Sequence, residues 1–195
     1  MEQSTRTRLL AAAERILVER GVNALSVRKI GEAAGLNPTL VTYHFGSLVA
    51  LLDELCSTNL DPLLAEWSRI GADDDAPEPL DEVLKAWLVP MLRPAAFTPE
   101  GRALTVLDEL AAHGEPALQA RVLSAMEAFA ARLRAVLAPL LPGLSETELR
   151  ARLRFISGAA LGPPPRVHRV SSAGGSMSLG DITYLLPFAR AALSG

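Results

Sequence analysis

The chain of 195 residues contains one cysteine, two lysines and few aromatic residues, and it has no long apolar run. The single cysteine, Cys56, excludes a framework of internal disulfides and is typical of a reducing compartment. The longest apolar stretches are interrupted by Arg, Glu or Pro, and none reaches the roughly 18 residues that a membrane span requires. No charged segment leads into an apolar stretch at the N-terminus. We therefore expect no signal peptide, no membrane partner and a cytoplasmic location.

The sequence also lacks the residue patterns of common catalytic and metal sites. Its three histidines, His44, His113 and His168, and Cys56 lie far apart and without the spacing of metal ligands. No glycine-rich phosphate loop and no serine with a patterned histidine partner is present. We expect no metal, no cofactor and no catalytic residue, and an enzyme of unknown type is the least favoured interpretation.

Leucine and alanine together make up one third of the chain, and both are strong helix formers. Because β-branched and aromatic residues are few, the composition favours an all-α protein. Apolar periodicity, capping residues and Gly or Pro breaks predict about nine helices. The predicted segments are 5–20, 26–34, 38–45, 47–67, 80–92, 98–113, 115–137, 145–161 and 179–193. Residues 71–79 and 162–178, which are rich in Gly and Pro, are predicted to be loops.

Charge is distributed unevenly along the chain, although the net charge is only −3. Residues 1–50 carry six basic and four acidic side chains, whereas the remainder has an excess of five acidic ones. This mild asymmetry permits a nucleic-acid-binding N-terminal end.

The segment 26–45 predicts two short helices joined by a tight turn at Gly35. Ser26 is a suitable cap for the first helix, and Asn37 followed by Pro38 is a favourable start for the second. This layout is typical of a helix-turn-helix, whose second helix enters the major groove of DNA. A small helical hairpin without a role in DNA binding is the alternative interpretation.

At these residues the chain resembles the tetracycline-repressor (TetR) family. Residues 25–37 read LSVRKIGEAAGLN and residues 40–47 read LVTYHFGS, and the resemblance extends over about residues 5–55. The resemblance implies a homodimeric regulator with a three-helix DNA-binding head and a helical-bundle body. The resemblance thus predicts two domains: a head at residues 1–47, which binds DNA, and a body at residues 48–195, which binds a small molecule and dimerises through its last two long helices.

The resemblance and the polar character of segment 26–48 together suggest the residues that meet DNA. Two positions depart from the family pattern, because Thr42 stands where an aromatic residue is usual and Leu48 where lysine is usual. Backbone N–H groups of the following helix, or Arg6 and Arg8, are candidate replacements for that lysine. For Arg28 the alternative is a solvated helix face, and for His44 it is packing under the first helix. The DNA-binding candidates are Ser26, Arg28, Lys29, Asn37, Pro38, Thr39, Leu40, Thr42, Tyr43, His44 and Leu48.

Large apolar residues scattered through the body are candidates for the wall of a small-molecule pocket, with ordinary core packing as the alternative. The favoured wall consists of two pairs, Trp87 with Met91 and Met126 with Phe129. Asp108 is expected to be buried and Glu109 to be solvated. The full ligand-binding set is Trp67, Trp87, Met91, Leu104, Leu107, Asp108, Ala111, Met126, Phe129 and Phe155.

The last two predicted helices carry stripes of small and apolar residues, which allow close helix packing. The resemblance implies that these stripes form the dimer interface, and a core within one chain is the alternative. The interface candidates are Leu149, Leu153, Ile156, Ala160, Leu185, Ala189 and Ala192.

The sequence thus predicts a ligand-responsive, DNA-binding transcriptional regulator. The favoured form is a homodimeric repressor that a small apolar or amphipathic molecule releases from double-stranded operator DNA. A helical small-molecule-binding protein without operator function is the main alternative.

Overall fold

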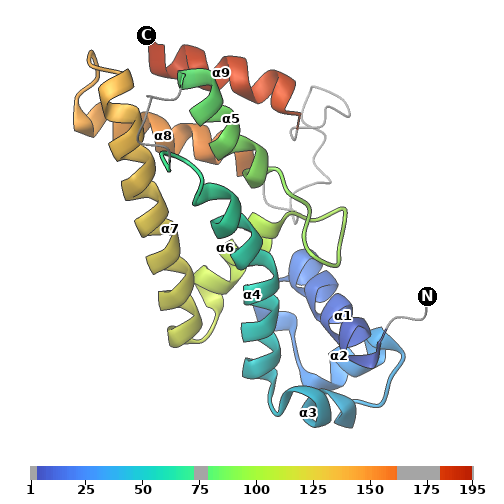
Figure 1. Ribbon diagram of the computed structural model, residues 1–195. Helices are drawn as coiled ribbons and strands as arrows, with labels where there is room; N and C mark the ends of the chain where they lie inside the picture. The colour runs from blue at the N-terminus through green and yellow to red at the C-terminus, as the bar shows by residue number, and fades with distance from the viewer. Residues whose placement is uncertain (1–3, 73–78, 162–180, 195) are drawn as a thin grey trace. The chain divides into compact units, whose positions relative to one another are not determined.

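The computed structural model describes residues 4–72, 79–161 and 181–194. Within these ranges the chain forms nine α-helices and no strand, which confirms the predicted all-α class. Figure 1 labels the helices along the chain. Their bounds are α1 (Thr5–Arg20), α2 (Val27–Ala34), α3 (Thr39–Phe45), α4 (Leu48–Trp67), α5 (Leu80–Met91), α6 (Ala103–His113), α7 (Pro116–Leu137), α8 (Glu146–Leu161) and α9 (Ile182–Ser194).

Most predicted boundaries agree with these bounds to within one or two residues, but the predicted start of α6 at residue 98 is wrong. Residues 98–101 form a turn instead, in which the Gly101 N–H donates to the Thr98 carbonyl at 2.9 Å. Arg102 then forms an isolated antiparallel bridge with Pro94, and α6 begins at the next residue. The predicted loop at 162–178 and most of the loop at 71–79 lie outside the described residues.

Serine side chains cap several helices, as the sequence predicts. The Ser26 hydroxyl accepts the Lys29 N–H at 3.2 Å, and the Ser47 hydroxyl accepts the Ala50 N–H at 3.0 Å. At the start of α8, the Ser145 N–H donates to the Glu148 carboxylate while the Glu148 N–H donates to the Ser145 hydroxyl. These reciprocal bonds form a capping box, which satisfies donors that a helix start leaves without partners.

The chain divides into two compact units that do not follow the chain order. Unit 1 comprises residues 1–61 and 94–123, and unit 2 comprises residues 62–93 and 124–195. This division is made on packing and does not test the functional division at residue 47, which stays a prediction.

Unit 1 contains α1–α3, most of α4, α6 and the start of α7. In it, α1 packs against α2 and α6, and α2 packs against α3. The side chains of Leu9, Leu17, Ile30 and Val41 are fully buried there. These residues recur at helical spacing, so each helix turns one apolar face into a shared core.

Unit 2 contains the end of α4, α5, most of α7, α8 and α9. Its α5 packs against both α8 and α9, and α8 packs against α9. Leu84, Leu88, Ile156 and Ala189 are fully buried at these contacts. Small residues such as Ala189 allow the helix axes to approach closely.

Candidate nucleic-acid interface

The turn between α2 and α3 is built from two glycines and an asparagine. Gly35 ends α2 in the left-handed conformation, with φ of 63°, which glycine adopts without steric cost. At Gly31 an added Cβ would lie 2.7 Å from the Cα of Pro38, so only glycine permits this close approach. The Asn37 carboxamide oxygen accepts the Thr39 N–H at 3.0 Å and caps α3 as predicted.

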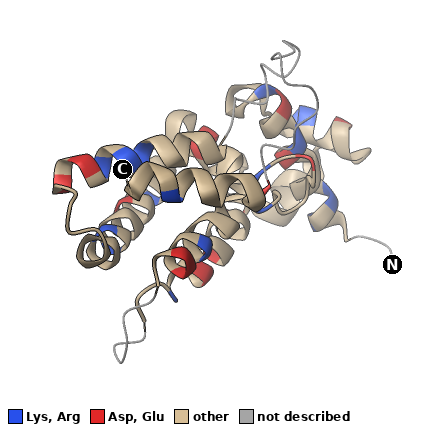
Figure 2. Ribbon diagram, turned by 90° about the horizontal axis from the view of Figure 1, so that it is seen from above, with Lys and Arg blue, Asp and Glu red and all other residues tan. Residues whose placement is uncertain are grey.

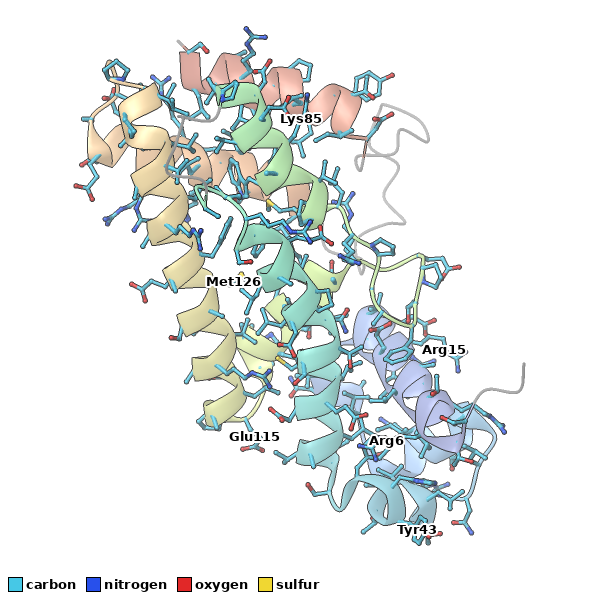
Figure 3. The ribbon with its side chains drawn as sticks, viewed as in Figure 1. Arg6, Arg15, Tyr43, Lys85, Glu115 and Met126 are labelled. Carbon is cyan, nitrogen blue, oxygen red and sulfur yellow. The ribbon has the colours of Figure 1, made fainter. Side chains whose placement is uncertain are left out.

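α3 buries one face and exposes the other. Val41 and Phe45 are buried in unit 1, and Leu40 is half-buried. On the opposite face Thr39 and Thr42 are exposed, and Tyr43 is the most exposed large hydrophobic residue of those described, at 80%. Figure 3 shows Tyr43 pointing away from the helices of the head.

Two further α3 candidates, Pro38 and His44, have structural roles at its ends. Pro38 adopts helical dihedrals just before the first assigned residue of α3, which agrees with its predicted place in the first turn. The His44 ring is half-buried and meets the edge of the Tyr43 ring, with 5.1 Å between the ring centroids. Only part of the His44 side chain is therefore available to a ligand.

The basic side chains of α2 are already bonded within the head. Arg28 forms an ion pair with Glu32 at 2.7 Å, and the hydrogen bond raises the pKa of its guanidinium. Lys29 donates to the Ala24 carbonyl at 3.1 Å, and Ser26 uses its hydroxyl for capping. Both cations remain exposed, so a phosphate could still compete for them.

Arginines of α1 bind the C-terminal end of α2. Arg8 donates to the Ala34 carbonyl at 2.8 Å, and Arg15 donates to the Ala33 carbonyl at 2.9 Å. These cations satisfy carbonyls that the helix end leaves free and meet the negative end of its dipole. Arg8 therefore has a role inside the head, while Leu48, the first residue of α4, is half-buried.

Six of the ten ligand-binding candidates lie in unit 2. Trp67, Trp87 and Met91 are buried, and the Trp67 indole N–H donates to the Trp87 carbonyl at 3.0 Å. The Trp67 ring stacks on Phe129, with centroids 3.9 Å apart and planes 11° apart. Met126 and Phe129 on α7 are half-buried. We call the contacting residues Trp67, Trp87 and Phe129 the apolar cluster. Phe155 is 72% exposed in the single chain.

The other four ligand-binding candidates lie on α6 in unit 1. Leu104 and Leu107 are buried, and Ala111 is half-buried. Asp108 was expected to be buried and Glu109 to be solvated, and both expectations are wrong. Asp108 is exposed and Glu109 is half-buried. Glu109 accepts the Val22 N–H at 3.2 Å and so links α6 to the end of α1.

The predicted dimer stripe on α8 and α9 is mostly buried inside one chain. Of the seven candidates, Ala192 alone is half-buried, and the other six are less than 10% exposed. They are covered by contacts among α5, α8 and α9, so the alternative of an intramolecular core describes these side chains. The large hydrophobic side chains that these two helices leave exposed are Phe155, Tyr184 and Phe188. Sequence periodicity could not separate the two sets because both follow helical spacing.

Other chemistry finds little support in the described part of the chain. There, no three His, Cys, Asp or Glu side chains gather closely enough to hold a metal ion. Cys56 is buried, and burial raises the pKa of its thiol to about 11, which disfavours the reactive thiolate. None of the described helices has both the length and the apolar character needed to cross a membrane.

A short helix with an exposed polar face, held by a glycine turn against a second short helix, defines the helix-turn-helix class of DNA-binding proteins. Residues 9–55 match the family model for "Bacterial regulatory proteins, tetR family". The N-terminal region of the chain is thus similar to that of TetR-family regulators.

Curated relatives match over part of the chain. The HTH-type transcriptional repressor KstR2 of Rhodococcus jostii is 37% identical over 67 residues, which are 34% of this chain and 33% of that protein. KstR2 of Mycobacterium tuberculosis is 35% identical over 80 residues, which are 41% of this chain and 39% of that protein. The chain thus matches between one third and two fifths of the length of these relatives.

Solved structures resemble the chain over nearly its whole length. The TetR-family regulator PfmR of Thermus thermophilus covers 96% of this chain, with a TM-score of 0.66 and 20% identity, and the match includes 98% of its own chain. A transcriptional regulator from Rhodococcus covers 97%, with a TM-score of 0.62 and 22% identity, and matches over 94% of its length. At these identities the likeness establishes the fold alone.

Proposed function

We propose that the chain is a transcriptional repressor that binds operator DNA as a homodimer and releases it when a small apolar or amphipathic molecule binds. The observation that carries the proposal is the exposed polar face of α3, formed by Thr39, Thr42 and Tyr43. A major groove about 12 Å wide admits one helix with its side chains, and short hydroxyl-bearing residues let the backbone approach base edges. The name "repressor" of the curated relatives supports the sign of regulation.

In this proposal α3 enters the major groove and Tyr43 reaches a phosphate. Two copies of α3 in a dimer would read half-sites about 34 Å apart, or a longer distance in phase with the helix. Fragments from around the protein's own gene are the natural first probe, because many repressors control their own transcription units.

The test is a binding titration of such fragments at several salt concentrations, with random duplex of equal length as control. Specific binding predicts a higher affinity for one fragment at every salt concentration. Equal affinities for all duplexes would favour the alternative, a helical binding protein without operator function. That alternative draws on Leu48 and on the engagement of Arg8, Arg28 and Lys29 inside the head.

For the dimer we propose the exposed aromatic face of α8 and α9, defined as Phe155, Tyr184 and Phe188, in place of the buried stripe. These side chains are between 49% and 72% exposed in the single chain. α9 carries one charged side chain in its described length, Arg190. The helix that ends at the C mark is mostly tan in Figure 2, the colour of uncharged residues. Aromatic residues with little charge are typical of the centre of an interface between subunits.

For the effector we propose a site in unit 2 lined by Trp87, Met91, Met126 and Phe129. Apolar walls with few polar groups suit an apolar or amphipathic ligand. α4 runs unbroken from the end of the head at Leu48 to Trp67, which contacts Trp87 and Phe129. A ligand that moves this cluster can bias α4 only if it binds one of the two states of the protein more tightly.

The coupling of effector and operator is testable because it must be reciprocal. Typical couplings of about 1–3 kcal/mol correspond to about 5- to 150-fold changes in affinity. A compound found by a thermal-shift screen should bind the operator complex more weakly than the free protein, by the factor with which it weakens operator binding. Equal affinities in two calorimetric titrations, with and without operator, would contradict the proposed response.

A further inference from the structure

Arg6 in the first turns of α1 contacts two other helices of unit 1. Its Nε donates to Glu54 Oε1 on α4 at 2.9 Å, and its Nη2 bonds to Oε2 of the same carboxylate. Its Nη1 donates to the His44 carbonyl at the end of α3 at 2.6 Å. The guanidinium also lies over the Phe45 ring, 4.4 Å from its centroid. Figure 3 shows Arg6 between α1 and α4, above α3.

These contacts engage all three nitrogen atoms of the planar guanidinium. One edge of the guanidinium binds a carboxylate with two parallel bonds, and a third N–H reaches a helix C-terminus. The hydrogen bond that Arg6 donates to Glu54 raises the pKa of Arg6, which therefore stays charged. A lysine could replace the charge but not the simultaneous bonds to α3 and α4.

Under the proposed function, DNA binding requires fixed relative positions of the three helices that Arg6 joins. α3 carries the exposed polar face, and Gly46 and Ser47 alone separate it from α4. Arg6 bridges this two-residue connection, because it bonds to the His44 carbonyl in the last turn of α3 and to Glu54 in the second turn of α4.

We propose that Arg6 is a positioning residue for operator binding, which fixes α3 against α4 through Glu54 and His44 and does not itself bind phosphate. This inference rests on the proposed function, since it concerns how the same head meets DNA. The competing role, in which Arg6 supplies the cation that Leu48 lacks, makes the opposite prediction for Glu54.

Glu54→Gln distinguishes the two roles by the sign of its effect. If Glu54 and Arg6 position α3, the substitution weakens the bidentate pair and lowers operator affinity, by about two- to tenfold. If Arg6 binds phosphate, removal of the competing carboxylate frees the cation and raises the affinity for operator and random DNA alike. Glu146→Gln on α8 is the matched control, because it removes an equal charge from another exposed ion pair, with Arg150.

Arg6→Lys and Arg6→Gln provide the second measurement, in which operator affinity is followed against salt. For a positioning residue, both variants lose specific affinity to a similar extent and the salt slope is unchanged. For a phosphate ligand, Arg6→Lys retains binding, and Arg6→Gln reduces the slope by about one unit. The double variant Arg6→Gln with Glu54→Gln should lose no more than Arg6→Gln alone, because both changes remove the same link.

Circular dichroism and thermal unfolding identify variants that fail to fold, and Glu54→Gln is the mildest of them. Operator affinity that rises in Glu54→Gln, or stays unchanged in it and in both Arg6 variants, would overturn this inference while wild-type binding keeps the proposed function intact. A wild-type protein that shows no preference for any duplex would instead remove the proposed function.

Discussion

The two units of the molecule differ in the contacts inside their cores and in the side chains on their surfaces. Among the described residues, the buried polar side chains are Glu14 and Asn59, and both lie in unit 1. The Glu14 carboxylate accepts the Asn59 amide at 2.9 Å and the Phe97 N–H at 2.6 Å. The side-chain oxygen Oδ1 of Asn59 accepts the Ala96 N–H at 3.1 Å. The described buried side chains of unit 2 are apolar, and its exposed ones include three aromatic rings.

This difference corresponds to two kinds of binding. Directional hydrogen bonds specify one arrangement of α1, α4 and the segment at residues 96–97. A helix that reads DNA needs such a fixed frame. Aromatic rings in water favour association with another apolar surface and require little directional specificity. Under the proposed function, unit 1 recognises DNA and unit 2 carries the contact between subunits. Each prediction below changes one side of this comparison.

The largest effect is expected from charge placed on the aromatic face of unit 2. The double substitution Phe155→Arg with Phe188→Arg sets like charges against each other across a symmetric interface and should leave a monomer. Loss of the second head should weaken operator binding by about 100-fold or more. Light scattering after size exclusion measures the mass, and an operator titration measures the affinity.

Leu123→Arg is the matched control for that variant, because Leu123 is an exposed apolar residue of unit 1, at 57%. It should leave both the mass and the operator affinity unchanged. A double variant that remains a dimer would place the subunit contact elsewhere, and the contrast between the surfaces of the units would lose its functional meaning.

The next effect concerns the buried polar bonds of unit 1. Glu14→Ala leaves the Phe97 N–H without an acceptor and Asn59 with fewer bonds, so the free energy of unfolding should fall by about 2–4 kcal/mol. Urea unfolding measures this loss. Glu19→Ala, an exposed acid on the same helix, should change stability by less than about 0.5 kcal/mol. Similar values for the two variants would mean that the buried bonds do not hold unit 1 together.

A smaller effect, confined to DNA binding, is expected at the exposed face of α3. Tyr43→Ala and Thr39→Ala remove one DNA contact each and should lower operator affinity by about 5- to 30-fold, as expected for about 1–2 kcal/mol. The melting temperature should stay within about 2 °C, because both side chains are exposed. Thr147→Ala on α8 is the matched exposed threonine and should change neither quantity. Unchanged affinity in both α3 variants would remove this helix from the interface.

Capping and periodicity predicted the helices well because the residues that carry these signals are close together along the chain. Ser26, Asn37, Ser47 and the Ser145 capping box each bind donors within three residues along the chain, so their role follows from spacing. The start of α6 was missed for the same reason. Thr98 and the two residues after it resemble a helix start, while the bond from the Ala95 N–H to the Gly101 carbonyl closes a loop there instead.

Contacts between distant residues could not be predicted. The residues Arg6 and Glu54 are 48 positions apart, and no periodicity links them. The stripes of α8 and α9 were predicted as a dimer interface with an intramolecular core as the alternative, because a pattern of apolar residues does not tell which surface covers them. The order of Asp108 and Glu109 was reversed for a similar reason, since the partner of Glu109 is a backbone N–H of Val22, 87 positions away.

The smallest effect is expected from a cation added beside α3. Leu48 is half-buried at the first residue of α4, so a lysine there can lay its methylenes along the protein and extend its amine to a phosphate. Leu48→Lys should raise affinity for operator and random DNA alike, by about two- to fivefold, and steepen the salt slope by about one unit. Ala117→Lys adds the same charge near the start of α7 and should leave the slope unchanged. If both variants behave alike, added charge acts on DNA only at long range, and position 48 does not face the backbone.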